Sequence, residues 1–368
     1  MGAQRYRTEF KRLLENTVLP EGISLEEKNN RLLPLTKYLV EHVPSRLFRY
    51  RTCSEMNLDA FNEDKLFAVT SDKFNDPYDC LIRYDKEMLK QSIIAGMSKD
   101  VILSLKGLLR TGSDFPEMWK TLYDQEFLNQ VKTTIVNADD NTIEKYGEIM
   151  VGMKHSLDER IDKITEEVVK TVKQLTFIAC FGEDIHSVTM WSHYADSHRG
   201  FALEYAPKSL QLNCQLCNQM KQCNKAAVCN LYPVIYQQRR CDATDFLGLN
   251  IGQCMGLPIK NPDTFATTKF LLYKSVQWNY EKEWRLIISK FNEPQNKAPF
   301  CLDNIRPAAI YYGSRISPIN KKMLHLIAQE KGITEYQMFI DDKSYNYSVK
   351  YVRERTKASP PRDPLFCK

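Results

Sequence analysis

Apolar residues recur along this chain with two different spacings, which separate helical from strand segments. Residues 1–45 carry apolar side chains at helical spacing in two stretches, and the second stretch ends before Pro44 because a residue that precedes proline is disfavoured in the helical region. The segment SRLFRYRT then alternates with the two-residue period of a strand, in which Arg49 and Arg51 share one face. The chain is therefore expected to begin with a helical cap and the first strand of a sheet.

The segments that follow predict an α+β fold. A short helix leads to the strand KLFAVTS and the turn-rich loop FNDPYD, and residues 85–175 show long helical periodicity with many charges. Further strands are predicted in LTFIACF, RGFALEYA, LYPVIYQ, EWRLIISK, PAAIYYG and TEYQMFI, and helices in SVTMWSHYAD, TFATTKFLLYKS and SPINKKMLHLIAQEKG. We expect a mixed, largely antiparallel sheet that carries a cleft.

The same pattern suggests where the chain divides. Residues 1–45 form the cap, and residues 46–355 form a single α+β domain. Two insertions interrupt this domain, a helical one at 85–175 and a cysteine-rich one at 208–230. Residues 356–368 are rich in proline and are expected to be a flexible tail.

Composition indicates a globular protein and narrows its function. Hydrophobic residues make up 43% and aromatic residues 11% of the chain, which is enough apolar surface for a sizeable core. The net charge of +5 is spread along the chain without a basic block, so nucleic-acid binding is permitted but not indicated. The chain start lacks the apolar core of a signal peptide, and no long apolar run occurs, so we expect a cytoplasmic protein with no membrane anchor.

Four cysteines lie close together in the polar stretch LNCQLCNQMKQCNKAAVCN, with the spacing C-x2-C-x5-C-x5-C. Four thiolates can hold a zinc ion tetrahedrally and fold an insertion that has no core of its own. The alternative is a loop of reduced thiols that binds no metal. The candidate ligands are Cys214, Cys217, Cys223 and Cys229.

Five motifs in a fixed order carry a resemblance to a known family. They are LFRYR, FNDPYD, MWSHYADSHRGFALEY, W-x-YE-x-EWR and IYYGSRIS, and the resemblance covers roughly residues 46–340. Together they resemble a bacterial family that is known only as a domain of unknown function, marked by RY, FNDPxD, MWxHYA and ExEWR motifs. This resemblance implies no settled activity, so function has to be inferred from the residues.

The leading strand, helix and strand also resemble, more loosely, the opening of the ADP-ribosyltransferase superfamily. In that superfamily a basic residue or histidine on the first strand and a Ser, Thr or Tyr on the second bind NAD, and a glutamate on a later strand, often within E-x-E, is catalytic. The corresponding residues occur here in the same order, namely Arg49 or Arg51, Thr70 with Ser71, and Glu281 with Glu283. The resemblance implies NAD as the cofactor.

The chemistry explains why these residue types are needed. Cleavage of the nicotinamide glycosidic bond builds positive charge on the ribose, which a carboxylate such as Glu283, supported by Glu281, would stabilise. A guanidinium can grip a pyrophosphate bidentately, so we expect Arg49 and Arg51 to meet Glu283 and Arg285 in the cleft. The predicted cofactor-binding residues are Arg49, Tyr50, Arg51, Thr70, Ser71, Asn75, Asp76, Trp191, His193, Tyr194 and Arg285.

Each assignment has a structural alternative. Glu283 and Arg285 could pair with the two arginines as an ion network without any substrate, Asp76 could form an Asx turn, and Trp191 could belong to the core. The leading hypothesis is an NAD-using enzyme similar to ADP-ribosyltransferases, a toxin or defence effector that modifies a protein or nucleic-acid acceptor. Two other classes stay open: a non-enzymatic module that binds a nucleotide or phosphorylated ligand, and a nucleic-acid processing protein with a divalent metal.

Overall fold

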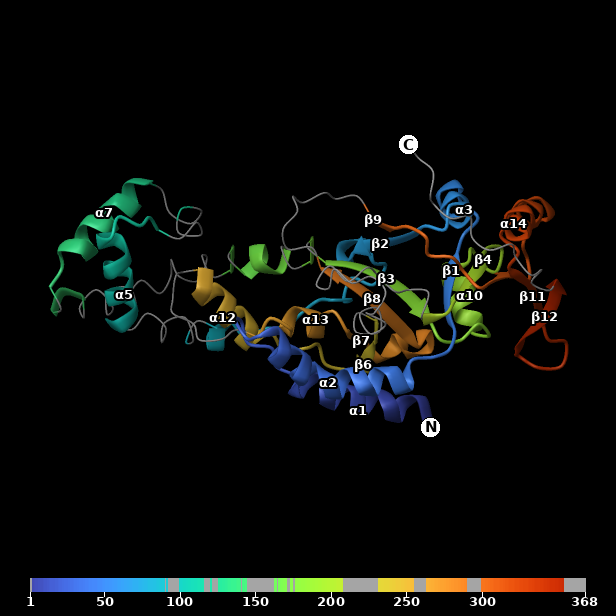
Figure 1. Ribbon diagram of the computed structural model, residues 1–368, viewed down its shortest axis with the longest axis horizontal. Coiled ribbons are helices and arrows are strands. Elements are labelled where there is room, and N and C mark those ends of the chain that lie inside the picture. Colours follow the sequence, from blue (N-terminus) through green and yellow to red (C-terminus); the bar gives the residue numbers. More distant parts are fainter. Residues whose placement is uncertain are drawn as a thin grey trace.

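A ten-stranded sheet with helices on both sides forms the centre of the molecule (Figure 1). A computed structural model describes residues 2–89, 91, 99–115, 120, 125–139, 141–143, 162–163, 165–170, 173–174, 176–207, 231–254, 263–289 and 299–353. The strands of the large sheet are β1 Leu47–Arg51, β2 Leu66–Thr70, β3 Thr176–Gly182, β4 Phe201–Tyr205, β5 Leu231–Pro233, β8 Glu283–Ser289, β9 Phe300–Leu302, β10 Ala309–Tyr312, β11 Thr334–Ile340 and β12 Tyr347–Arg353. Two further strands, β6 Ile235–Gln237 and β7 Tyr273–Ser275, form a small separate sheet.

The expected α+β fold with a mixed, largely antiparallel sheet is confirmed. The strand order is β12-β11-β10-β4-β1-β3-β2-β9, and β8 lies between β3 and β5. Within the large sheet β10 and β11 run parallel, joined by the helix α14 Pro318–Lys331, whereas the other described pairings are antiparallel.

The register assigns the side chains of the central strands to two faces, because neighbouring residues in a strand point to opposite sides. Glu283 of β8 lies opposite Gly182 of β3, and Gly182 lies opposite Phe48 of β1. These residues therefore share one face, together with Arg285. This face also carries the helix α10 Val188–Tyr194, whose buried residues belong to the same hydrophobic cluster as Phe48.

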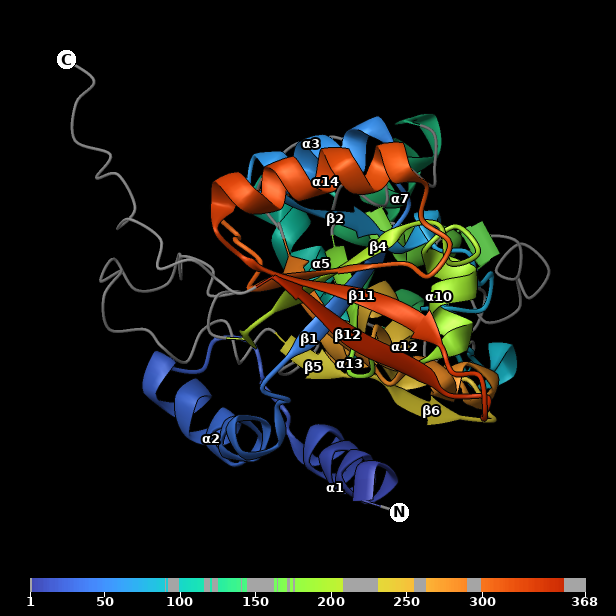
Figure 2. The ribbon, with the colours of Figure 1, turned by 90° about the vertical axis from the view of Figure 1, so that its right-hand side faces the viewer.

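The opposite face is covered by helices from both ends of the chain. The first two helices, α1 Gly2–Asn16 and α2 Leu25–His42, lie along one part of it, and α3 Glu55–Asn62 lies with α14 along another (Figure 2). The main core unites these helices with the sheet through Phe10, Leu14, Leu35, Leu39, Phe61, Phe181, Trp284, Leu286, Leu324 and Ala328. Burial of these large apolar side chains is the main force that holds α1 and α2 on the sheet.

Further helices of the described ranges include α5 Lys99–Arg110, α7 Gln125–Asn137, α12 Thr244–Cys254 and α13 Ala266–Phe270, with the short 3-10 turns η1 Ser71–Lys73 and η3 Val276–Glu281. The pair α5 and α7 belongs to the expected helical insertion and lies at one end of the molecule, away from the sheet (Figure 1). Its own small cluster contains Leu105, Leu109, Phe115, Leu128 and Ile135.

Local sequence signals determine both ends of α14. The hydroxyl of Ser317 accepts a hydrogen bond from the backbone N–H of Asn320, and Pro318 occupies the first turn of α14. Gly332 ends this helix in the left-handed conformation, with φ of 61°.

One expected helix is largely absent. The segment TFATTKFLLYKS was predicted to be helical, but α13 covers only Ala266–Phe270, and the chain then forms β7. The reason is tertiary pairing: Tyr273 lies beside Ile235 of β6, and the N–H of Ile235 donates to the carbonyl of Leu272 at 2.7 Å. The strands β9 and β12 and the helix α12 were not predicted.

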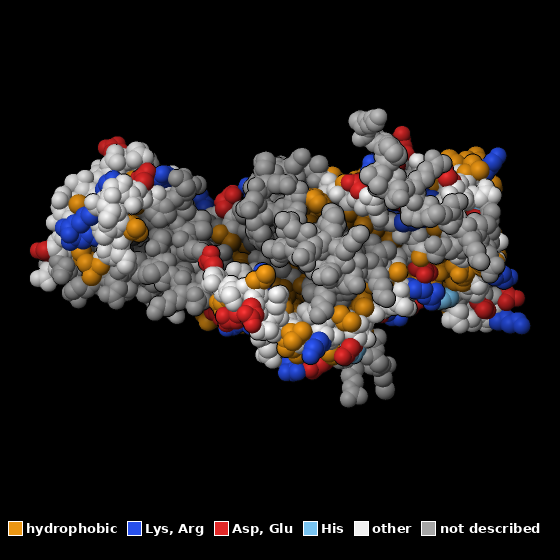
Figure 3. All heavy atoms as spheres, in the orientation of Figure 1, with side chains coloured by type: hydrophobic (Ala, Val, Ile, Leu, Met, Phe, Trp, Pro, Cys, Tyr) orange, Lys and Arg blue, Asp and Glu red, His pale blue; other side chains and the backbone are white. Residues whose placement is uncertain are grey.

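Charged side chains of both signs are interspersed over the described part of the face that Figure 3 shows. No extended field of lysine and arginine gathers on the described part of this face. Among the helices of the described ranges, none combines the length and apolar character needed to cross a membrane.

Candidate functional site

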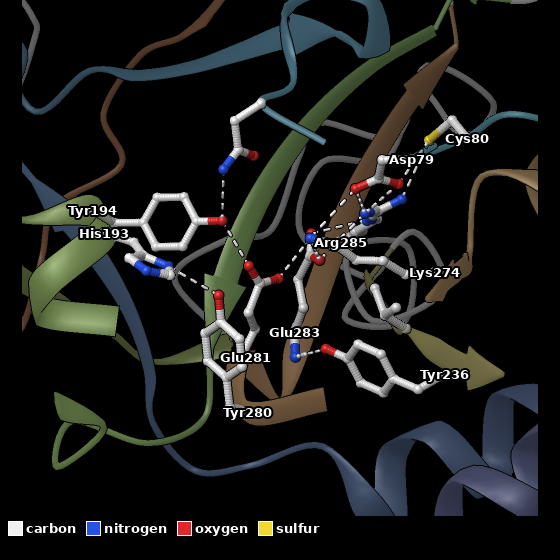
Figure 4. Close-up of polar contacts among 12 residues, drawn as sticks. Asp79, Cys80, His193, Tyr194, Tyr236, Lys274, Tyr280, Glu281, Glu283 and Arg285 are labelled. Atoms are coloured by element: carbon white, nitrogen blue, oxygen red, sulfur yellow. Dashed lines mark hydrogen bonds and ion pairs between the residues drawn. The ribbon is translucent and has the colours of Figure 1, made fainter. Parts of the chain in front are cut away.

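Three carboxylates from separate segments converge on the ammonium group of Lys274 (Figure 4). Its Nζ lies 2.6 Å from Glu281 Oε2, 3.1 Å from Glu283 Oε2 and 3.3 Å from Asp79 Oδ2. Lys274 is 7% exposed, and each of the three acids is less than 5% exposed. Buried charges of this kind persist only when they are paired and hydrogen-bonded.

Arg285 neutralises the inner part of this cluster. Its guanidinium, which is fully buried, donates from Nη2 to the two oxygens of Asp79 at 2.8 and 2.6 Å and from Nε to Glu283 Oε1 at 2.8 Å. Its Nη1 donates to the carbonyl of Leu271 at 2.6 Å. With all groups ionised, the two cations Lys274 and Arg285 face three carboxylates, so the cluster carries one negative charge in excess.

The excess charge falls on Glu281. Burial and the nearby charge of Glu283 raise the pKa of Glu281 to about 7, even though Lys274 and Tyr194 act in the opposite direction. Burial alone would also raise the pKa of Glu283, but the adjacent Arg285 and Lys274 hold that pKa well below its usual range. Glu281 can therefore gain or lose a proton near neutral pH, whereas Glu283 stays ionised.

The chain turns sharply between the two glutamates. The residue that follows the 3-10 turn η3 is Lys282, which has φ of 45° and ψ of 49°, in the left-handed region. A residue with a Cβ adopts this conformation at a cost of about 1–2 kcal/mol. The turn places Glu281 in η3 and Glu283 at the start of β8, so that both carboxylates reach one ammonium group.

Aromatic and amide side chains lie between Glu281 and solvent. The hydroxyl of Tyr194 donates to Glu281 Oε1 at 2.6 Å, and the amide of Asn75 donates to the same hydroxyl at 3.4 Å. Tyr194 is half-buried, and Asn75 is exposed. Glu281 is thus linked to the exposed Asn75 through two hydrogen bonds, with Tyr194 between them.

A second group of rings flanks this position. The ring of His193 lies 5.9 Å from that of Tyr280 and 6.4 Å from that of Trp278, and its Nδ1 is 2.9 Å from the Tyr280 hydroxyl. The ammonium of Lys274 lies 4.9 Å from the centre of the Trp278 ring. His193 is exposed, and Trp278 and Tyr280 are half-buried, so their rings form a partly open aromatic surface beside Glu281.

The arginines of β1 do not join this cluster. Because Phe48 lies opposite Gly182, Phe48 and Tyr50 share the face of Glu283, and Arg49 and Arg51 point to the other face. Arg49 donates to the carbonyl of Phe67 and lies 5.8 Å from the Phe181 ring. The expectation that these arginines meet Glu283 in one cleft is wrong.

Other predicted residues serve local structure. Trp191 is fully buried and donates to the Ile185 carbonyl at 2.7 Å, and Tyr50 packs edge-on against it at 5.2 Å. Asp76 accepts a hydrogen bond from the N–H of Tyr78, as in an Asx turn. The structural alternatives for Trp191 and Asp76 therefore describe the observed contacts.

Thr70 at the end of β2 and Ser71 at the start of η1 form no side-chain hydrogen bond with the cluster among the described residues. The hydroxyl of Thr70 donates to Asp72. Ser71 is buried, and its hydroxyl has no hydrogen-bond partner among the described residues. Of the predicted cofactor-binding residues, the structure brings Asn75, His193, Tyr194 and Arg285 close to the two glutamates.

Sequence reasoning missed two central residues. The candidate site residues named from the sequence include neither Asp79 nor Lys274, and Lys274 lies in the segment TFATTKFLLYKS, for which a helix is expected. The signal for Lys274 was available, because a single lysine inside the apolar run FLLYKS must either reach solvent or find buried carboxylates. For Asp79, the signal was its place in the same loop as Asn75.

The proposed metal ligands Cys214, Cys217, Cys223 and Cys229 lie outside the described residues. Within the described ranges, no group of three His, Cys, Asp or Glu side chains could hold a metal ion. The three carboxylates of the cluster instead surround an ammonium group, which takes one oxygen from each of them.

Part of the chain matches a known protein family. Residues 190–286 match the model of a family described as "Protein of unknown function (DUF2971)". The matched stretch contains Tyr194, Lys274, Glu281, Glu283 and Arg285 but not Asp79. No curated protein and no solved structure matches the chain. Over residues 190–286, which carry most of the cluster, the chain is thus similar to a family of proteins of unknown function.

Proposed function

We propose that this protein is an enzyme that cleaves the nicotinamide glycosidic bond of NAD and transfers the ADP-ribosyl group to a protein or nucleic acid, with Glu281 as the carboxylate that acts on the substrate. The observation that carries the proposal is the position of Glu281. It is buried against Lys274, hydrogen-bonded to Tyr194, and adjacent to a partly open aromatic surface. The resemblance of the E-x-E segment to that of ADP-ribosyltransferases supports NAD as the substrate.

The chemistry favours Glu281 over Glu283 for this role. Cleavage of the glycosidic bond develops positive charge on the ribose, which a nearby carboxylate stabilises. Glu283 gives its oxygens to Arg285 and Lys274, so its charge is already compensated inside the protein. Glu281 shares one oxygen with Lys274 and the other with the Tyr194 hydroxyl, which a substrate hydroxyl could replace.

The aromatic surface beside Glu281 fits a planar base. Rings such as Trp278 and Tyr280 recognise planar groups by stacking, and a substrate held there would place its ribose near the carboxylate. His193, hydrogen-bonded to Tyr280, helps to hold these rings in place. The exposed amide of Asn75 adds a donor at the same opening.

A metal-dependent nuclease is less well supported by this geometry. Such an enzyme needs carboxylate oxygens directed at a divalent cation. Here Lys274 lies at the point where Asp79, Glu281 and Glu283 converge. The buried lysine therefore provides the positive charge at that point.

The proposal is tested by measuring nicotinamide release from NAD by the wild type and by Glu281→Gln. Loss of a positioned carboxylate should lower the rate at least about a hundredfold. The matched control is Glu63→Gln, which removes a surface glutamate that also pairs with a lysine, Lys65. This control should retain the wild-type rate.

Two results would reject the proposal. One is release by Glu281→Gln at the wild-type rate. The other is nucleotide binding by the wild type without any turnover, which would indicate a binding module.

A further inference from the structure

The first helix is connected to the strand that carries Glu283, although it packs on the opposite face of the sheet. Arg7 of α1 is 7% exposed. Its Nε donates to the carbonyl of Val234 at 3.0 Å, and its Nη2 donates to the carbonyl of Glu283 at 3.2 Å. One side chain of α1 therefore joins the backbones of two neighbouring strand segments.

The backbone of Glu283 is held by two further hydrogen bonds. The N–H of Val234 donates to the Glu283 carbonyl at 2.9 Å, and the N–H of Glu283 donates to the Tyr236 hydroxyl at 2.8 Å. The guanidinium of Arg7 lies 5.5 Å from the centre of the Tyr236 ring. Arg7 thus contacts both partners that hold the backbone of Glu283.

An ion pair stabilises Arg7 in this position. Its Nη2 lies 2.7 Å from Glu183 Oε1, and the side chains are 7% and 15% exposed. The indole N–H of Trp284 donates to the same carboxylate oxygen at 2.7 Å, and the hydroxyl of Tyr6 donates to it as well. Glu183 therefore links α1 to the residue that follows Glu283.

We propose that α1 supports the candidate site through Arg7, which is a positioning residue. Arg7 holds the backbone of Glu283, and the two glutamates thereby keep their arrangement around Lys274. Arg7 does not touch the reacting groups in this account. It acts through the peptide of Glu283 and, through Lys282, on the turn that places Glu281. Undocking of α1 would then uncouple the two carboxylates, which provides a means of regulating the site.

The left-handed turn at Lys282 makes the position of Glu281 depend on these contacts. Lys282 adopts an unfavourable conformation, which persists only while the surrounding contacts fix the chain on both sides of it. Arg7 supplies part of this restraint on the Glu283 side. Without it, the turn can relax, Glu281 can move away from Glu283 towards water, and its protonation should become more like that of a free glutamate.

The test compares Arg7→Ala and Arg7→Lys with Arg12→Ala. Arg12 lies on the same helix and pairs with Glu9 at the surface, so it is a matched control. Arg7→Lys retains the positive charge beside Glu183 but lacks the planar guanidinium that bonds to two carbonyls. It provides a folded variant for the test if Arg7→Ala unfolds.

The first readout is the titration of Glu281, which carbon NMR of labelled glutamate side chains monitors. The resonance of Glu281 is assigned as the one that disappears in Glu281→Gln. The titratable groups of the described residues that interact with Glu281 are Lys274, Glu283, Tyr194, Tyr236 and Tyr280. Both Arg7 variants should lower the Glu281 pKa by about one unit or more, and Arg12→Ala should leave it unchanged. The second readout is hydrogen exchange of the peptide that spans residues 281–284, which should become at least about tenfold faster in the Arg7 variants alone.

The inference is overturned if folded Arg7→Lys shows the wild-type titration and exchange, or if Arg12→Ala shows the same changes. An effect of Arg7 on the rate of catalysis rests on the proposed function. If that function is correct, the Arg7 variants should lower kcat with little change in KM. The two readouts above need no turnover. An inactive wild type whose Glu281 responds to Arg7 would reject the proposed activity and retain the positioning role.

Discussion

Glu281 and Glu283 bind the same ammonium group of Lys274, at 2.6 and 3.1 Å, yet their acidities are shifted in opposite directions. Glu283 has the additional guanidinium of Arg285, whereas Glu281 has the hydroxyl of Tyr194. One carboxylate is thereby fixed as a permanent charge, and its neighbour titrates near neutral pH. Pairs of this kind allow an acid and a base to operate side by side.

Stability should depend on pH through Glu281. Its pKa is 4.5 when unperturbed and about 7 in the folded chain, so the folded state holds the proton more tightly. Glu281 therefore contributes stability that is fully present below about pH 4.5 and is lost as the pH rises through about 7. Glu281→Gln, which mimics the protonated form, should gain up to about 3 kcal/mol in unfolding free energy relative to the wild type between pH 5 and pH 8. Urea denaturation at the two pH values measures this difference, and an equal offset at both would contradict it.

Replacement of Lys274 should be strongly destabilising. Lys274→Met leaves Asp79, Glu281 and Glu283 with Arg285 as the one described cation of the cluster, and breaking a buried ion cluster costs about 3–5 kcal/mol. The loss should be smaller in the double variant with Glu281→Gln, because one negative charge is removed as well. A double-mutant cycle of unfolding free energies measures the coupling. Additive effects of the two changes would show that the two side chains do not interact.

The left-handed turn at Lys282 gives a prediction about backbone strain. Lys282→Gly and Lys282→Ala both remove the surface ion pair with Asp184, so the comparison between them isolates the conformational effect. Glycine adopts positive φ without steric cost, and the glycine variant should be more stable than the alanine variant by about 1 kcal/mol. Thermal or urea unfolding of the two variants provides the measurement. A higher stability of Lys282→Ala than of Lys282→Gly would show that the turn at Lys282 is not strained.

Removal of the Tyr194 hydroxyl should make Glu281 a weaker acid. The hydroxyl donates to the charged form of the carboxylate and so lowers its pKa, and Tyr194→Phe should raise that pKa above about 7. Tyr280→Phe is the control, since its hydroxyl is bonded to His193 and not to Glu281. Carbon NMR titration of both variants distinguishes them, and the same Glu281 pKa in the two variants would argue against the assigned bond.

Arg49 should be dispensable for turnover. It lies on the face of the sheet opposite to Glu283, where it donates to the Phe67 carbonyl. Arg49→Met should therefore release nicotinamide within a few-fold of the wild-type rate, while Glu281→Gln does not. A loss as large as that of Glu281→Gln, in a folded variant, would mean that the substrate also reaches the β1 arginines.

Much of this arrangement follows from the sequence, and the failures have a common physical cause. Glu283 and Arg285 share one face of β8, and strand alternation correctly predicts that Arg49 and Arg51 share a face of β1. It could not predict that these faces are opposite, because that depends on Phe48 pairing with Gly182, and a shift of one residue would reverse it.

Lys274 and Asp79, which complete the cluster, could not be identified from local sequence patterns for a related reason. Lys274 lies in a segment whose local pattern is helical, and its strand forms only by pairing with β6. The role of Asp79 depends on Arg285, which is 206 positions away in the chain. Long-range pairing, and not local propensity, assembles the site.

The most direct measurement of the central claim is the titration of Glu281 itself in the wild-type protein. The glutamate carboxyl resonance that disappears in Glu281→Gln should titrate with a pKa of about 7, as burial next to an ionised Glu283 requires. Titration of that resonance near 4.5, the unperturbed value, would show that Glu281 is solvated and that the carboxylates do not converge on Lys274.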